Sequence, residues 1–160
     1  MDSATGDLIV SSKVDIRQLN TVDIPQILRI ERACFDDPWP AGWFHRAIRW
    51  RDICRGIFVS GMLAGYLIAF KESSARIHLA NFAVDLPFRR QGVGAKLLES
   101  LMIFVVENQY SNIYLEVRRS NAEAIRFYEK NGFRLSGEEI GYYEGTEDAL
   151  IYIWVSNGVV

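Results

Sequence analysis

The 160-residue sequence has few cysteines and no long apolar run. Two cysteines, Cys34 and Cys54, are too few for a disulfide scaffold, and neither has the CxxC or Cys/His spacing of a metal site. The longest apolar run, residues 97–106, is interrupted by polar residues and is much shorter than the roughly 20 residues of a membrane span. Residues 1–13 have neither a basic start nor an apolar core, so they do not predict a signal peptide. We therefore expect a reducing, cytoplasmic location.

The chain also lacks an excess of charge of either sign. Its net charge is −2, with 24% charged and 49% hydrophobic residues, which is typical of a globular protein. This balance does not predict a nucleic-acid or membrane partner. Internal repeats and linkers of Pro, Gly or Ser are missing too, so we expect one domain over residues 14–156 after a flexible tail at 1–13. The sequence does not predict the oligomeric state.

Hydrophobic periodicity predicts an α/β domain. Helices are expected after a cap at Asn20 or Thr21 and over 43–50, 92–109 and 121–131; strands are expected at 14–19, 57–60, 63–70, 77–84, 113–117, 133–143 and 149–155. The strand–helix–strand unit from 77 to 117 predicts two parallel strands, side by side or nearly so, whereas the strands before it read as an antiparallel meander. We expect a mixed, mostly antiparallel seven-stranded sheet with a parallel central pair and helices on both faces.

A turn with two glycines connects the strand 77–84 to the following helix. Backbone N–H groups at a helix N-terminus attract anions, and glycine lets a phosphate approach the backbone closely. The Walker pattern fails because no Ser or Thr follows Lys96, and the dinucleotide pattern fails because Leu97 stands at its third glycine. The turn alone does not distinguish a phosphate-binding site from a turn that binds no ligand. The candidate cofactor residues are Arg89, Arg90, Gln91, Gly92, Val93, Gly94, Ala95 and Lys96.

Residues 89–95 resemble the Arg/Gln-x-x-Gly-x-Gly/Ala signature of the GNAT acetyltransferases, which grips the pyrophosphate of coenzyme A in that family. Further segments resemble the RimI-type branch, in the right order and over nearly all of the chain from 14 to 154: 37–39, 81–84, 114–118, 120–133, 142–143 and 147–149. The resemblance implies the GNAT fold and acetyl-CoA as the cofactor. It implies direct transfer of the acetyl group, in a ternary complex, to the α-amino group of a protein N-terminus, with a ribosomal protein as one candidate acceptor.

Two residues are candidates for proton transfer. Glu116 shares a strand face with Tyr114 and Arg118, and alternation alone favours a salt bridge between Glu116 and Arg118. The resemblance instead implies that Glu116 is the general base, acting directly or through water. Tyr128 is implied as the general acid for the departing thiolate, although its pattern alone favours a packed ring with its hydroxyl at the surface.

The remaining candidates concern the cofactor arm and the acceptor. Asn121 and Ala124 share a helix face with Tyr128 and could border the pantetheine, and Asn121 could also cap the helix, with Ser120 and Glu123 as a capping box. The resemblance implies that the strand Phe82, Ala83 and Val84 pairs with the pantetheine. It also implies acceptor contacts from Pro38, Trp39, Tyr142 and Tyr143, which in isolation would be read as packing. No metal is expected, since His45 and His78 have no metal-ligand spacing.

Two alternatives to protein N-terminal acetylation stay open at this stage. One is an enzyme of the same fold that acetylates lysine side chains or small amines. The other is a non-catalytic acyl-CoA-binding module, which would need the turn at 89–96 but would have no use for Glu116 or Tyr128.

Overall fold

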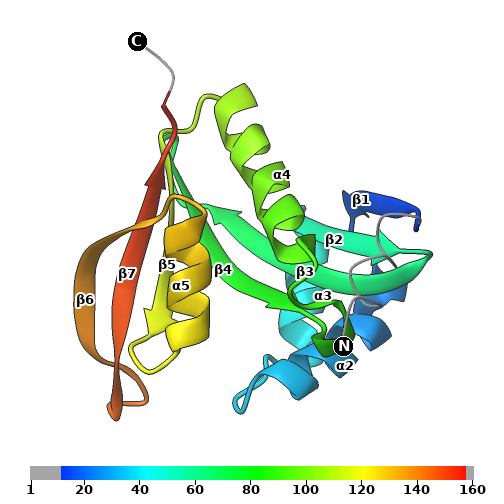
Figure 1. The fold of residues 1–160 in the computed structure, drawn as a ribbon, viewed down its shortest axis with the longest axis horizontal. Helices are drawn as coiled ribbons and strands as arrows, with labels where there is room; N and C mark the ends of the chain where they lie inside the picture. The colour runs from blue at the N-terminus through cyan, green and yellow to red at the C-terminus, as the bar shows by residue number, and fades with distance from the viewer. Residues whose placement is uncertain (1–11, 158–160) are drawn as a thin grey trace, which may run out of the picture. The chain divides into compact units, whose positions relative to one another are not determined.

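The computed structural model describes residues 12–157, so the expected tail at 1–13 lies outside the described residues except for Ser12 and Lys13. Figure 1 shows the elements in chain order. The strands are β1 (Val14–Gln18), β2 (Ile53–Val59), β3 (Met62–Lys71), β4 (Arg76–Val84), β5 (Asn112–Arg118), β6 (Arg134–Tyr143) and β7 (Glu147–Val155). The α-helices are α2 (Ile24–Cys34), α3 (Ala41–Arg49), α4 (Val93–Glu107) and α5 (Ala122–Lys130), and two 3-10 turns are η1 (Thr21–Asp23) and η2 (Leu86–Phe88).

The strands form one seven-stranded sheet in the order β1-β2-β3-β4-β5-β7-β6. The pairs β1–β2, β2–β3, β5–β7 and β6–β7 are antiparallel. β4 and β5 are parallel, with His78 opposite Tyr114 in their register. The predicted mixed sheet with a parallel central pair is confirmed.

Element boundaries differ most from the prediction at β2. The strand begins at Ile53, four residues before the expected start at 57, because Arg55 and Gly56 pair with both β1 and β3. A Cβ atom at Gly56 would lie 2.6 Å from a methyl carbon of Leu19, so a larger residue here would have to displace the side chains packed around it. Pairing and close packing therefore extend a strand that propensity alone does not predict.

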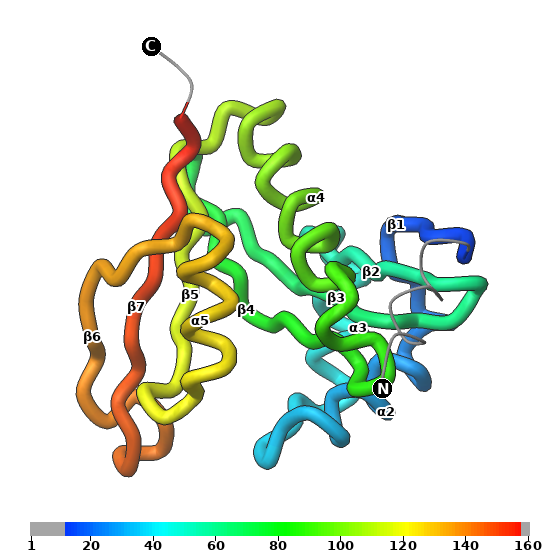
Figure 2. The backbone as a smooth tube through the Cα atoms, viewed as in Figure 1, coloured from blue at the N-terminus to red at the C-terminus, as the bar shows by residue number. Residues whose placement is uncertain are grey.

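The described chain divides into two compact units. Figure 2 traces the backbone, with its colour running from the N-terminus to the C-terminus. The first comprises the residues up to Ala69 and Asn81–Leu101, and the second comprises Phe70–Ala80 and the residues from Met102 onward. The expected single domain over 14–156 stays a prediction.

In the first unit, α2 packs one apolar stripe into the core. Ile24, Ile27 and Ile30 are buried at helical spacing. β3 is buried on both faces along most of its length, as expected for a central strand. The connection from β1 to α2 is fixed by Asp23, which accepts hydrogen bonds from both terminal nitrogens of Arg17 and from the Asn20 N–H.

In the second unit, β5 alternates half-buried and buried residues, and Leu115 and Val117 point to the buried side. α5 lies beside β7, since the Tyr152 hydroxyl donates to a carboxylate oxygen of Glu129 at 2.7 Å. The helix ends as predicted at Asn131 and Gly132, because Gly132 has a φ of +89°, which glycine adopts readily.

Candidate active site

The glycine-containing turn leads directly into α4. Arg90 and Gly92 have positive φ values of 59° and 77°, and α4 begins at Val93. Across residues 12–157, no hydrogen bond uses the N–H groups of Val93, Gly94 or Ala95, while Lys96 N–H closes the first helical bond onto Gly92. These are the donors that a helix N-terminus presents to an anion, so the turn fits a pyrophosphate group.

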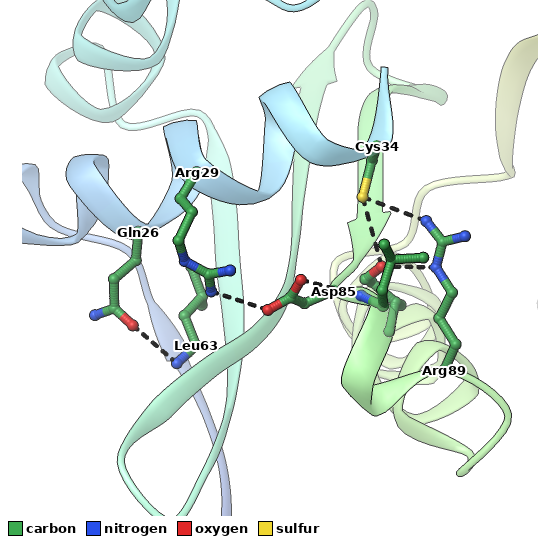
Figure 3. Close-up of polar contacts among 8 residues, drawn as sticks. Gln26, Arg29, Cys34, Leu63, Asp85 and Arg89 are labelled. Atoms are coloured by element: carbon green, nitrogen blue, oxygen red, sulfur yellow. Dashed lines mark hydrogen bonds and ion pairs between the residues drawn. The ribbon is translucent and has the colours of Figure 1, made fainter. Parts of the chain in front are cut away.

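The side chain of Arg89 fixes the turn to neighbouring segments (Figure 3). Its Nε donates to the Val84 carbonyl at 3.0 Å, and its Nη2 lies 3.3 Å from Sγ of Cys34 at the end of α2. Nearby, Arg29 of α2 pairs with the buried Asp85 at 2.9 Å, and Asp85 in turn accepts from the Leu86 N–H. Both arms of this network connect the glycine-containing turn to α2.

The strand that precedes the turn is held closely against β3. Asp85 N–H donates to the Ala64 carbonyl at 2.8 Å. A Cβ atom at Gly65 would lie only 2.8 Å from the Ala83 oxygen, so the glycine permits this approach. Phe82 and Val84 are half-buried on one face, whereas Ala83 is buried on the other.

The loop with Pro38 and Trp39 depends on a buried carboxylate that the sequence reading missed. Glu31 of α2 is 1% exposed. It accepts hydrogen bonds from the Trp39 N–H at 2.9 Å, from the Asn81 amide at 3.0 and 3.2 Å, and from the Tyr66 hydroxyl. No ion pair within the described range includes Glu31. Uncharged donors alone therefore replace the water that a buried carboxylate loses.

The ring of Trp39 packs against other aromatic rings. Its ring lies 5.3 Å from the ring of Trp43, edge to face, and 5.6 Å from that of Phe44. Phe44 in turn meets the ring of Tyr66, which also donates to Glu31. The loop is thus held by its main chain at one point and by its indole ring at another.

In the second unit, Glu116 forms a hydrogen bond with a histidine that was not among the predicted site residues. Glu116 Oε2 lies 2.6 Å from His78 Nε2, and the His78 ring stacks on Tyr114 at 4.6 Å. Arg118 instead pairs with Glu147 at 3.1 Å. The alternative reading of Glu116 as the ion-pair partner of Arg118 is therefore wrong, because β7 supplies the carboxylate for Arg118.

Tyr128 is a buried residue, 8% exposed, rather than a ring with its hydroxyl at the surface. It packs against Phe127 and Phe133, at 5.4 and 5.5 Å between ring centres. Burial, with a smaller contribution from Tyr143, raises the pKa of the Tyr128 phenol well above its ordinary value. The phenol therefore keeps its proton throughout the neutral range.

The pair Tyr142 and Tyr143 lies near the charge of Glu116. Burial first, then the carboxylates of Glu116 and Glu139, raise the pKa of Tyr142. Burial, Tyr142 and the charge of Glu116 raise the pKa of Tyr143 to about 12, against a lowering influence of Arg118. The Arg118 guanidinium lies 4.0 Å above the Tyr143 ring.

Asn121 caps α5, as the sequence predicted. Its side-chain oxygen accepts the Ala124 N–H at 3.1 Å. The capping box considered for Ser120 and Glu123 does not form, because the Ser120 N–H, which the Glu123 carboxylate would accept, donates to Glu147 instead.

Each unit brings part of the predicted site together. In the first, Glu31 connects the Pro38–Trp39 loop to Asn81, the residue before Phe82. In the second, Glu116 lies near the Tyr142–Tyr143 pair. Two sequence signals could have indicated the missed residues: Glu31 interrupts the apolar stripe of a helix, and His78 lies on the strand predicted to pair with that of Glu116.

Two negative findings hold for residues 12–157. No group of three or more His, Cys, Asp or Glu side chains is placed to hold a metal ion. Within the same residues, none of the helices combines the length and the apolarity needed to cross a membrane.

Comparison with known proteins agrees with the fold. Residues 24–133 match the acetyltransferase (GNAT) family, and the chain belongs to that family. It is therefore an acetyl-CoA-dependent acyltransferase, and the alternative of a non-catalytic acyl-CoA-binding module is wrong.

Individual relatives show which branch of the family the chain resembles. The chain is 34% identical over 139 residues to the [ribosomal protein bS18]-alanine N-acetyltransferase of Escherichia coli, covering 85% of this chain and 93% of that one. The crystal structure of the ribosomal-protein-S18-alanine N-acetyltransferase from E. coli superposes with a TM-score of 0.84 at 31% identity, over 92% of this chain and 97% of the other. Ard1 from Thermoplasma volcanium gives a TM-score of 0.86 at 29% identity, over 91% and 99%. The predicted likeness to the RimI-type branch is confirmed.

Proposed function

We propose that this enzyme transfers the acetyl group of acetyl-CoA directly to the α-amino group of a protein N-terminus, in a ternary complex. The observation that carries the proposal is the 34% identity, over most of both chains, to an enzyme named for acetylating a protein's N-terminal alanine. A ribosomal protein is one candidate acceptor. The cytoplasm is the proposed location, since both cysteines are free thiols.

The residues proposed to hold acetyl-CoA fit its chemistry. The unused N–H groups of Val93–Ala95 suit the pyrophosphate, and Arg90 and Lys96 add positive charge. We assign the backbone of Phe82–Val84, together with Asn121 and Ala124, to the pantetheine arm. Arg89 acts mainly by fixing the turn through Val84 and Cys34. Acetyl-CoA supplies the activated acetyl thioester.

Glu116 is the proposed general base. An α-amino group has an ordinary pKa of about 7.7–8.0, so a carboxylate that removes its proton directly or through a water suffices at neutral pH. The hydrogen bond from His78 restricts the Glu116 carboxylate to one orientation, and stacking on Tyr114 restricts His78 in turn. We therefore add His78 as a positioning residue for the base.

Tyr128 is the proposed general acid for the departing sulfur. Its raised pKa keeps the proton available at any working pH. A thiol with a pKa of about 8.5 is a stronger acid than this phenol, so transfer of the proton to the departing thiolate is uphill by itself. We propose that Tyr128 donates a hydrogen bond that stabilises the charge on the sulfur as the thioester bond breaks. The proton passes to the sulfur as the free thiol leaves, and the phenol regains a proton from solvent.

The decisive experiment offers three kinds of acceptor with acetyl-CoA and measures thiol release. The acceptors are peptides with free N-termini, the same peptides with a blocked N-terminus and an internal lysine, and small amines. We expect release only with free peptide N-termini, and mass spectrometry should locate one acetyl group on the first residue. Faster reaction with the blocked lysine peptide or the small amines would support the remaining alternative.

A further inference from the structure

An exposed stripe of aromatic and cationic side chains follows α3, outside the groups assigned above. Trp43, Arg46 and Trp50 are spaced i, i+3 and i+7, so they share one helix face. Trp43 and Trp50 are 56% and 65% exposed, although tryptophan is usually well buried. The Arg46 guanidinium lies 4.4 Å above the Trp50 ring. Tryptophan and arginine are the side chains most enriched at the energetic centres of protein interfaces.

Positive charge concentrates beside this stripe. Arg49 and Arg51 are exposed like Arg46, in a chain whose net charge is −2. Of the ion pairs found in the described part of the chain, none includes any of these three arginines. A partner that carries carboxylates would complement this surface.

The stripe is continuous with the proposed acceptor loop. The ring of Trp39 touches that of Trp43 at 5.3 Å, and α3 begins immediately after Pro40. The nine residues of α3 extend about 13 Å at 1.5 Å per residue, which an extended peptide covers with about four residues. A polypeptide held by its first residues at the loop is long enough to reach Arg46 and Arg49 with the residues that follow.

We propose that the α3 stripe, together with Arg49 and Arg51, binds an acidic segment of the acceptor protein a few residues after the acetylated N-terminus. This inference rests on the proposed function, because it extends the same acceptor site. A polypeptide is favoured over RNA because the stripe continues from the acceptor loop. Three arginines are also fewer than the 6–10 phosphate contacts that give strong electrostatic binding to nucleic acid.

The test uses three peptides with identical first four residues and with three Glu, three Gln or three Lys at positions 6–8. For the wild-type enzyme we expect kcat/KM to fall in the order Glu, Gln, Lys, mainly through KM, with the differences shrinking as salt is added. Arg46→Glu combined with Arg49→Glu should lower kcat/KM for the Glu peptide by about five- to twentyfold and should raise it for the Lys peptide. Arg134→Glu, the same charge change at an exposed position of β6, should leave all three values unchanged.

Tryptophan fluorescence measures the affinity for each peptide without any turnover. Trp50→Ala should weaken binding of the Glu peptide and reduce the fluorescence change. Equal kcat/KM for the three peptides would overturn this inference and leave the proposed function intact, whereas no acetylation of any free N-terminus would overturn the proposed function. Binding of a single-stranded oligoribonucleotide that depends on Arg46 and Trp50, without discrimination among the peptides, would also overturn the inference.

Discussion

Glu31 is a single carboxylate that three segments of the first unit share. Its hydrogen bonds reach the Trp39 main chain, the Asn81 amide and the Tyr66 hydroxyl. Burial and the charge of Glu31 raise the pKa of Tyr66, so this hydroxyl stays a donor. The Pro38–Trp39 loop, the proposed binding loop for the acceptor protein, therefore depends on a carboxylate whose two oxygens both accept hydrogen bonds.

Replacing Glu31 by Gln should disturb the acceptor loop more than cofactor binding. The new amide places a donor opposite donors, which leaves buried groups unsatisfied and should lower stability by about 1–3 kcal/mol. We expect the KM for a peptide acceptor to rise several-fold while the Kd for acetyl-CoA stays within a factor of about two. Steady-state kinetics and calorimetry measure the two quantities. Tyr66→Phe, which keeps the bond to Trp39, is the matched control and should lower stability with little effect on the acceptor KM.

The roles proposed for Glu116 and Tyr128 predict a large loss of rate when either residue is replaced. General acid–base groups contribute about 10²–10⁴ in rate, so Glu116→Gln and Tyr128→Phe should each lower kcat at least about a hundredfold. Both variants keep the volume of the side chain, so the Kd for acetyl-CoA should change little. Stopped-flow measurement of thiol release separates chemistry from product release. A wild-type rate in either variant would remove the role assigned to that residue.

At the scale of elements, the junction of β1, η1 and α2 depends on Asp23. Hydrogen bonds from Arg17, and then the bond from the Asn20 N–H, lower the pKa of Asp23 against the opposing effect of burial. The folded-state pKa lies below the unfolded value, so the contribution to stability is complete above the unfolded pKa of about 3.9. It is lost as the pH falls through the folded-state value.

Asp23→Asn should therefore destabilise the protein in a pH-dependent way. At pH 7 the free energy of unfolding should fall by about 1–3 kcal/mol, since the charged bonds from Arg17 are lost. The difference from wild type should shrink as the pH falls below the unfolded pKa of about 3.9 and through the lower folded-state value, where the wild-type carboxyl takes up its proton. Urea unfolding at pH 7 and pH 3 measures both values. A constant difference across this range would contradict the assigned cause.

The anion site proposed at the turn before α4 can be tested by substituting one glycine. Gly92 has a φ of +77° and open space where a Cβ would lie, so a side chain fits there but would project beside the helix N-terminus. Gly92→Asp should weaken acetyl-CoA binding tenfold or more, because its carboxylate competes with the pyrophosphate for the same N–H groups. Gly92→Asn has the same shape and tolerates positive φ well, so it is the control. Titration calorimetry compares the two, and equal affinities would contradict an anion site at this turn.

At the scale of the whole molecule, the expected single domain can be tested by its unfolding. Trp39, Trp43 and Trp50 report on the first unit and Trp154 on the second. If the chain is one cooperative domain, fluorescence of a Trp154→Phe variant and far-ultraviolet circular dichroism should give the same midpoint. Acetyl-CoA at 100 times its Kd should raise both midpoints by about 5–10 °C, since this saturation adds about 2.7 kcal/mol. Separate transitions, or a shift in one probe alone, would contradict a single domain.

The local pattern of the sequence determined the order of strands and helices, the parallel pair and the glycine-containing turn before α4. These features depend on periodicity, on the length of a crossover and on glycine, all of which act over a few neighbouring residues. For the same reason, the sequence correctly indicated the cap at Asn121 and the left-handed Gly132. The motifs at 89–95 and 120–133 then gave the family.

Only the tertiary structure decided which side chains meet. Glu116 meets His78 rather than Arg118 because β4 lies parallel to β5 and β7 supplies Glu147 to Arg118. Glu31 supports Trp39 because α2, β3 and β4 converge on one buried carboxylate. Such contacts join residues far apart in the chain, and a buried polar group takes whichever partners the packed segments bring to it. The sequence determined the elements and their chemistry, whereas the packing of those elements determined the hydrogen-bond partners, since no local pattern encodes them.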